Sequence, residues 1–240
     1  MLLEICASSY QSAINAQKAG ADRIELCSEL ALGGITPSYG LIKKVIENLS
    51  IPVHVLIRPR SGNFTYSEEE FEIIKTDIKL CKELGCHGIV SGVLKADNTV
   101  DVIRTQELIE LSKPLSFTFH RAFDWVENSF EALEQLIAIG ATRVLTSGKK
   151  HTALEGMALL DVLKERAKNN IIILPGGGIN KESALLFKNK GFKEIHCSAS
   201  VISFQNADGK IPMSNQKLLD DSIMIHSDGD TIKAILASIS

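Results

Sequence analysis

Short runs of β-branched and other apolar residues alternate with longer segments of helical periodicity along the whole chain. Eight such runs recur at a spacing of about 30 residues, the size of one β-strand followed by one α-helix. The predicted strands lie at residues 2–7, 23–28, 52–59, 88–93, 115–121, 143–148, 171–176 and 195–200. Eight consecutive units favour an α/β fold with a single (β/α)8 barrel of the TIM type over an open sheet.

The helical segments carry recognisable boundary signals. The segment SEEEFEIIKTDIKLCKEL begins with Ser67, and Glu70 follows three residues later, a spacing typical of a capping box. A final helix is predicted at 230–239. The chain has no low-complexity segment and no linker, so residues 1–240 are predicted to form one domain. The polar stretch at about 203–228, punctuated by Gly and Pro, predicts a long loop after strand eight.

Four predicted helices end in glycine, and each of these glycines precedes an even-numbered strand. A glycine suits the left-handed position after a helix. The four are Gly20, Gly85, Gly140 and Gly191. Because side chains alternate across a strand, residues three and five positions after each glycine share the barrel interior. The residues three positions after the glycines are Arg23, Gly88, Arg143 and Glu194. The residues five positions after them are Glu25, Val90, Leu145 and His196.

This alignment predicts a structural polar layer of Arg23, Arg143 and Glu194, in which Gly88 leaves space for the long side chains. Ordinary barrel interiors are filled by Val, Ile and Leu. A buried charge without a partner costs several kcal/mol, so these groups need one another, water or a ligand. The position of the layer at the amino ends of the strands allows either a structural or a functional role.

Interior residues near the carboxyl ends of the strands are better candidates for function, because active sites of β/α barrels lie there. His120, in TFHRAFD, titrates near neutrality in its ordinary state and is the predicted proton-transfer group. Glu25 is the candidate partner base or orienting carboxylate. A hydrogen-bonded structural role for His120 at the barrel mouth stays open as the alternative.

A second group of residues predicts an anion site at the same mouth. Arg58, in RPRSGNFTY, presents a planar fork that suits carboxylate or phosphate. Gly176, Gly177 and Gly178, in PGGGIN, can expose backbone N–H groups before a helix. Ser198 adds a hydroxyl from strand eight. These residues favour a small anionic or phosphorylated ligand, although the three glycines also fit a plain tight turn.

Composition excludes several classes of function. The chain has 26 Lys and Arg against 29 Asp and Glu, a net charge of −3. We therefore expect no nucleic-acid partner and no anionic membrane surface. No apolar run reaches the roughly 18 residues that span a bilayer. Five cysteines without a repeating pattern indicate reduced thiols and a cytoplasmic location.

Several longer segments resemble the copper homeostasis protein CutC family. They include LLEIC, GADRIELC, IPVHVLIRPR, TFHRAFD and RVLTSG, and the resemblance extends to about residue 200. It implies a cytoplasmic β/α barrel that forms a homo-oligomer and takes part in copper handling. It supplies no agreed catalytic residues, so whether the chain is an enzyme stays open.

Copper(I) is soft and prefers thiolate or thioether ligands. Cys6 and Cys27 have interior phase on adjacent strands, which makes them the candidate Cu(I) ligands. Cys197 has the opposite phase, and Cys81 lies in a predicted helix. The alternative is that all of these are small apolar core residues. The sequence thus leaves two functions open, a Cu(I)-binding protein and an enzyme acting on a small anion.

Overall fold

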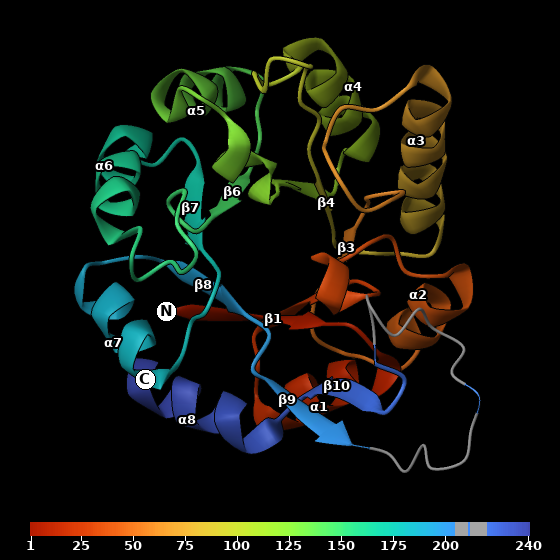
Figure 1. Cartoon of the computed structure of the whole chain (residues 1–240), viewed down its shortest axis with the longest axis vertical. Coiled ribbons are helices and arrows are strands. Elements are labelled where there is room, and N and C mark those ends of the chain that lie inside the picture. Colours follow the sequence, from red (N-terminus) through yellow and green to blue (C-terminus); the bar gives the residue numbers. More distant parts are fainter. Residues whose placement is uncertain (205–210, 212–219) are drawn as a thin grey trace.

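Eight parallel strands form the wall of the barrel and follow one another in sequence order around it (Figure 1). The structure, a computed structural model, describes residues 1–204, 211 and 220–240. The strands are β1 (Leu2–Ala7), β2 (Arg23–Leu26), β3 (Val53–Leu56), β4 (Gly88–Ser91), β5 (Ser116–Phe119), β6 (Arg143–Thr146), β7 (Ile172–Pro175) and β8 (Glu194–Cys197). Strand β8 pairs with β1, and a bridge between Gly176 and His196 joins the end of β7 to β8. The predicted (β/α)8 barrel is confirmed.

The helices form an outer ring around the strands (Figure 1). They are α1 (Tyr10–Ala19), α2 (Tyr39–Ile46), α3 (Glu68–Glu83), α4 (Val102–Ser112), α5 (Ser129–Ala138), α6 (Met157–Ala167), α7 (Lys181–Asn189) and α8 (Gly229–Ile239). The last helix, α8, contacts both α7 and α1 and so completes the ring. Two 3-10 helices, η1 (Leu30–Leu32) and η2 (Arg121–Trp125), follow β2 and β5. Within the described residues, no helix has the length and apolar character that crossing a bilayer requires.

Local signals in the sequence determine where the helices begin and end. The Ser67 hydroxyl accepts from the N–H of Glu70, and the Glu70 carboxylate accepts from the N–H of Ser67. The predicted capping box therefore starts α3. After α1, Gly20 adopts a φ of 96°, in the left-handed region where a side chain would be strained. The helix predicted at 230–239 is confirmed as α8.

Strand residues alternate between the helices outside and the barrel interior. Ile5, Ile24 and Ile195 are fully buried in the apolar core. The register pairs Glu4 with Arg23 of β2 on one side and with His196 of β8 on the other. Polar side chains from neighbouring strands are thereby brought next to one another inside the barrel.

An antiparallel ribbon of β9 (Ser200–Phe204) and β10 (Ile223–Ser227) follows the barrel and lies beside α1 (Figure 1). The sequence predicts a long loop over about 203–228. That prediction is wrong at both ends of the stretch, because the backbones of β9 and β10 pair with each other. Residues 205–210 and 212–219, which make up most of the predicted loop, lie outside the described residues.

The space at Gly88 is used differently from the prediction. A Cβ at this position would lie 2.4 Å from Cδ2 of His54, so the imidazole of His54 fills the space predicted for the arginines. This ring is buried, and its Nε2 lies 3.2 Å from the hydroxyl of Ser116. The absence of a side chain at Gly88 is therefore a packing requirement of His54.

We expect Gly88→Ala to lower the free energy of unfolding by about 1–3 kcal/mol, because the added methyl group overlaps the His54 ring. Gly40→Ala is the matched control, since a Cβ at Gly40 of α2 meets no atom within 4 Å. Alanine is also the better helix former there, so the control should be neutral or stabilising. Urea unfolding of both variants measures the difference, and equal midpoints would contradict the packing argument.

Candidate functional site

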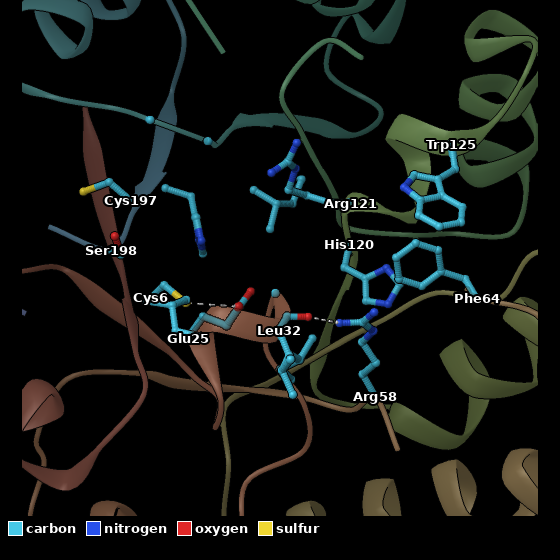
Figure 2. A pocket seen from close by; sticks show the side chains of 17 residues that line it. Cys6, Glu25, Leu32, Arg58, Phe64, His120, Arg121, Trp125, Cys197 and Ser198 are labelled. Atoms are coloured by element: carbon cyan, nitrogen blue, oxygen red, sulfur yellow. Dashed lines mark hydrogen bonds between the residues drawn. The ribbon is translucent and has the colours of Figure 1, made fainter. Parts of the chain in front are cut away.

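A cavity of about 460 Å³ opens at the carboxyl end of the barrel, among the loops that follow the strands (Figure 2). The predicted site residues that line it are Cys6, Glu25, Arg58, His120, Gly177, Gly178 and Ser198. Two others lie behind its wall. Cys27 is fully buried next to Cys6, and the N–H of Gly176 donates to the carbonyl of Thr146, which extends the pairing of β7 with β6. Gly176 therefore has no N–H left for an anion.

The two candidate metal ligands are neighbours. The Sγ atoms of Cys6 and Cys27 lie 3.6 Å apart, and the Cys6 thiol also lies 3.7 Å from Oε1 of Glu25. The hydrogen bond with Cys27, together with burial, raises the pKa of Cys6 well above its ordinary value. Both thiols are thus held together in a reduced pair, with a carboxylate beside Cys6.

Glu25 and His196 extend this pair into a cluster of possible metal ligands. The ligand atoms of Cys6, Glu25 and His196 all lie within 4.8 Å of one another, and all three residues are buried. Burial, with the nearby charge of Glu4, raises the pKa of Glu25 to about 7 despite the opposing effect of His196. Burial opposes a charge on His196, but the carboxylates of Glu25 and Glu4 outweigh it and raise the His196 pKa.

His196 is held by a carboxylate from the next strand. Its Nδ1 lies 2.7 Å from Oε1 of Glu4, which leaves Nε2 as the nitrogen available to a ligand. The offset from the preceding glycine places His196 in the same interior set as Glu25, but sequence reasoning did not select it as a site residue. The shared offset from glycine was the signal that could have identified His196. Its contact with Glu4 could not be predicted from the sequence.

The predicted polar layer lies below the cavity and is internally paired. Nη2 of Arg23 and Nε of Arg143 both donate to Oε2 of Glu194, at 2.5 and 2.8 Å. Nε of Arg23 also donates to Oε2 of Glu4 at 2.5 Å. Burial opposes the charge of Glu4, but the hydrogen bond from His196 and the charge of Arg23 outweigh it and lower the Glu4 pKa. None of the three predicted layer residues lines the cavity, which favours the structural role for them.

Arg58 holds the rim of the cavity together. Its Nη1 donates to the carbonyls of Leu32 and Gly34, and its Nη2 donates to the carbonyl of Gly62. Its guanidinium also lies 5.1 Å from the centre of the Phe64 ring. The fork predicted for an anion is therefore occupied by backbone oxygens. Only Nε remains buried without a partner in the described residues.

His120 follows β5 and caps η2. Its Nδ1 accepts from the N–H of Ala122 at 3.3 Å, so the ring proton belongs on Nε2. That Nε2 is buried and has no partner in the part of the chain that the structure describes. Burial and the charge of Arg58 lower the pKa of His120 to about 3. A neutral imidazole with a free N–H is suited to donate a hydrogen bond more than to accept a proton.

Three further cavity residues were missed as site candidates: Phe64, Arg121 and Trp125. Nε of Arg121 donates to Asp124 at 2.7 Å, and the Phe64 ring contacts His120 at a tilt and Trp125 edge to face. The i,i+3 spacing of Arg121 and Asp124 in TFHRAFD was the available signal. Figure 2 shows Arg58, His120 and Phe64 close together on one side of the cavity, opposite Cys6 and Glu25. Ser198 lines the wall at the end of β8, and its hydroxyl contacts that of Ser200.

The fold and the cavity define a β/α barrel with a thiol, carboxylate and imidazole cluster at its carboxyl end. The model of the CutC family matches residues 1–201. The "Copper homeostasis protein cutC homolog" of Homo sapiens is 47% identical over 199 residues, covering 82% of this chain and 73% of that protein. A CutC family protein of Parabacteroides distasonis is 42% identical over 240 residues, covering 98% of this chain and 99% of that protein.

A solved structure agrees with these relatives. The crystal structure of the putative copper homeostasis protein CutC from Streptococcus agalactiae superposes with a TM-score of 0.79 at 35% identity. The match covers 82% of this chain and 98% of that one. The chain therefore belongs to the CutC family, as its sequence motifs indicate.

The low pKa of His120 predicts a pH-dependent stability. In the unfolded chain a histidine takes up a proton near pH 6.5, whereas folded His120 takes it up only near pH 3. Protonation in that interval therefore favours the unfolded state. We expect the stability of the wild type to fall by about 2 kcal/mol relative to His120→Asn between pH 7 and 5.

Asparagine is the chosen replacement because its side-chain oxygen can still accept from Ala122 at a helix N-cap. Urea unfolding of both proteins at several pH values gives the difference in free energy directly. Parallel stability curves over this interval would show that folded His120 is protonated as readily as unfolded His120, and would contradict the buried neutral state.

Proposed function

We propose that this protein serves copper homeostasis by binding Cu(I) at Cys6 and Cys27, as the names of its relatives suggest for them. The observation that carries the proposal is the 3.6 Å separation of the two Sγ atoms, which come from segments 21 residues apart. Two buried thiols that face each other match the preference of Cu(I) for soft sulfur ligands. The ion is the cargo of such a protein and not a resident cofactor.

The surroundings of the thiols also suit a metal that must be bound and given up. Metal binding displaces the thiol protons, so an acceptor nearby lowers the cost of binding. The carboxylate of Glu25 is 3.7 Å from the Cys6 sulfur. His196 completes the cluster with an imidazole, a nitrogen ligand that copper accepts, and Glu4 orients it.

Reduced thiols are a condition of this proposal. All five cysteines are free and buried, so none forms a disulfide. We place the protein in the cytoplasm, where thiols stay reduced and copper is handled as Cu(I). The homo-oligomer implied by the family resemblance remains a prediction that sedimentation analysis of the purified chain can test.

The Cys6→Ser, Cys27→Ser double variant should lose the bound Cu(I), because serine hydroxyls are poor ligands for a soft ion. We expect about one Cu(I) per wild-type chain and close to none for the variant. The measurement is competition with a chromophoric Cu(I) chelator under anaerobic, reducing conditions.

Cys81→Ala is the matched control for this experiment. Cys81 is another fully buried thiol, but it lies in α3 outside the cavity. The control should retain the wild-type amount of Cu(I). If the double variant retains it as well, the copper site does not involve the thiol pair.

A further inference from the structure

A second corner of the cavity, away from the thiols, presents unused hydrogen-bond donors. Gly177 and Gly178 follow β7 with φ angles of 108° and 68° and precede the N-terminus of α7. Within the described residues, neither glycine N–H makes a hydrogen bond of normal geometry, although the bridge between Gly176 and His196 turns the Gly177 N–H toward the carbonyl of His196. Backbone N–H groups in such a turn before a helix form a concavity that favours anions.

Arg121 lies next to these glycines and is rigidly held. Its Nε donates to Asp124 at 2.7 Å, and its Nη2 donates to the hydroxyl of Ser147 at 2.8 Å. The Asp124 carboxylate in turn accepts from the Thr146 hydroxyl at 2.5 Å and from the N–H of Lys149 at 3.1 Å. The guanidinium is therefore oriented before any ligand arrives, which lowers the entropic cost of binding.

The free end of Arg121 points toward the glycine turn. Its Nη1 makes no hydrogen bond within the described residues, and it lies 3.5 Å from the position that a Cβ of Gly177 would occupy. A positive charge with an unused nitrogen thus lies beside the Gly177 end of this turn. Nearly half of the Arg121 side chain is exposed, so the corner is accessible from solvent.

A second observation in the same cavity also points to a ligand. Nε2 of His120 is a buried donor without a partner in the described residues, on a side chain that is only 4% exposed and lines the same cavity. Phe64 and Trp125 pack edge to face beside it, with 5.1 Å between their ring centres. A buried unpaired donor costs free energy that a ligand oxygen would recover.

We propose that the cavity binds a small phosphorylated organic molecule, with its phosphate group on Gly177, Gly178 and Arg121. The donors come from two backbone groups and one guanidinium, and a phosphate has several acceptor oxygens to receive them. The organic part lies along the aromatic wall, where His120 Nε2 donates to one of its oxygens. The proposal is independent of copper binding, because no thiol takes part in it.

The proposal also revises the cation predicted from the sequence. Arg58 was the predicted anion fork, but three backbone carbonyls occupy its Nη atoms. Arg121 instead has an unused nitrogen, and the fold places it next to the glycine turn. In this assignment Arg58 shapes the rim of the cavity and Arg121 contacts the anion.

The experiment measures binding of glycerol 3-phosphate and of inorganic phosphate to the full chain by calorimetry. We expect the wild type to bind glycerol 3-phosphate more tightly than inorganic phosphate, which lacks the organic part. Arg121→Ala should weaken glycerol 3-phosphate binding about tenfold or more, because a charged hydrogen bond is lost. Lys150→Ala is the matched control, since Lys150 is an exposed cation near the same mouth that does not line the cavity. It should change the affinity less than twofold.

Amide NMR spectra of the wild type provide a test that needs no variant. Addition of glycerol 3-phosphate should shift the Gly177 and Gly178 amide resonances more than other glycine resonances. Failure of the wild type to bind either phosphate overturns the proposal. Equal losses of glycerol 3-phosphate affinity in Arg121→Ala and Lys150→Ala would overturn the assigned phosphate site. Binding that leaves both glycine amide resonances unshifted would overturn it as well.

Discussion

Pairing of buried charges around Glu4 is the constraint on which the barrel interior depends. This fully buried carboxylate accepts from Arg23 on one neighbouring strand and contacts His196 on the other. Without such pairing, a charge inside the barrel would cost several kcal/mol. With it, β1, β2 and β8 carry polar side chains on their inner faces and keep one register. The same contact orients His196 toward the cavity.

The cavity above this network has two chemically different sides. Cys6, Glu25 and His196 form a compact group of a soft thiol, a hard carboxylate and a borderline imidazole on one side. On the other, Arg58 has no carboxylate within ion-pairing distance among the described residues, and its charge disfavours protonation of His120. The Cu(I) that we propose belongs to the first side, whereas the Nη atoms of Arg58 are already occupied by backbone carbonyls, so the proposed anion is assigned to Arg121 and the glycine turn. A single closed barrel brings the two within reach of one pocket.

The sequence predicts the barrel and its interior layers because both follow from periodicity and from the glycine offsets. The pairing of Arg23 with Glu194 lies within reach of that reasoning, since both residues have the same offset. The role of Arg58 could not be predicted in this way, because its partners are backbone carbonyls of loops, such as that of Gly34. Arg121 was passed over for a related reason. Its orientation depends on Asp124, which is held in turn by backbone groups of the loop after β6.

The pairing of β1 with β8 has a consequence for the order in which the chain can fold. Glu194 lies 171 residues after Arg23, so the network closes only when nearly all of the chain is available. On the ribosome, β1 and β2 emerge first, and Glu4 and Arg23 can already pair there. The opposite edge of β1 nevertheless stays open until β8 arrives. Folding should therefore be slow and cooperative, with the nascent barrel exposing an unpaired strand edge for most of its synthesis.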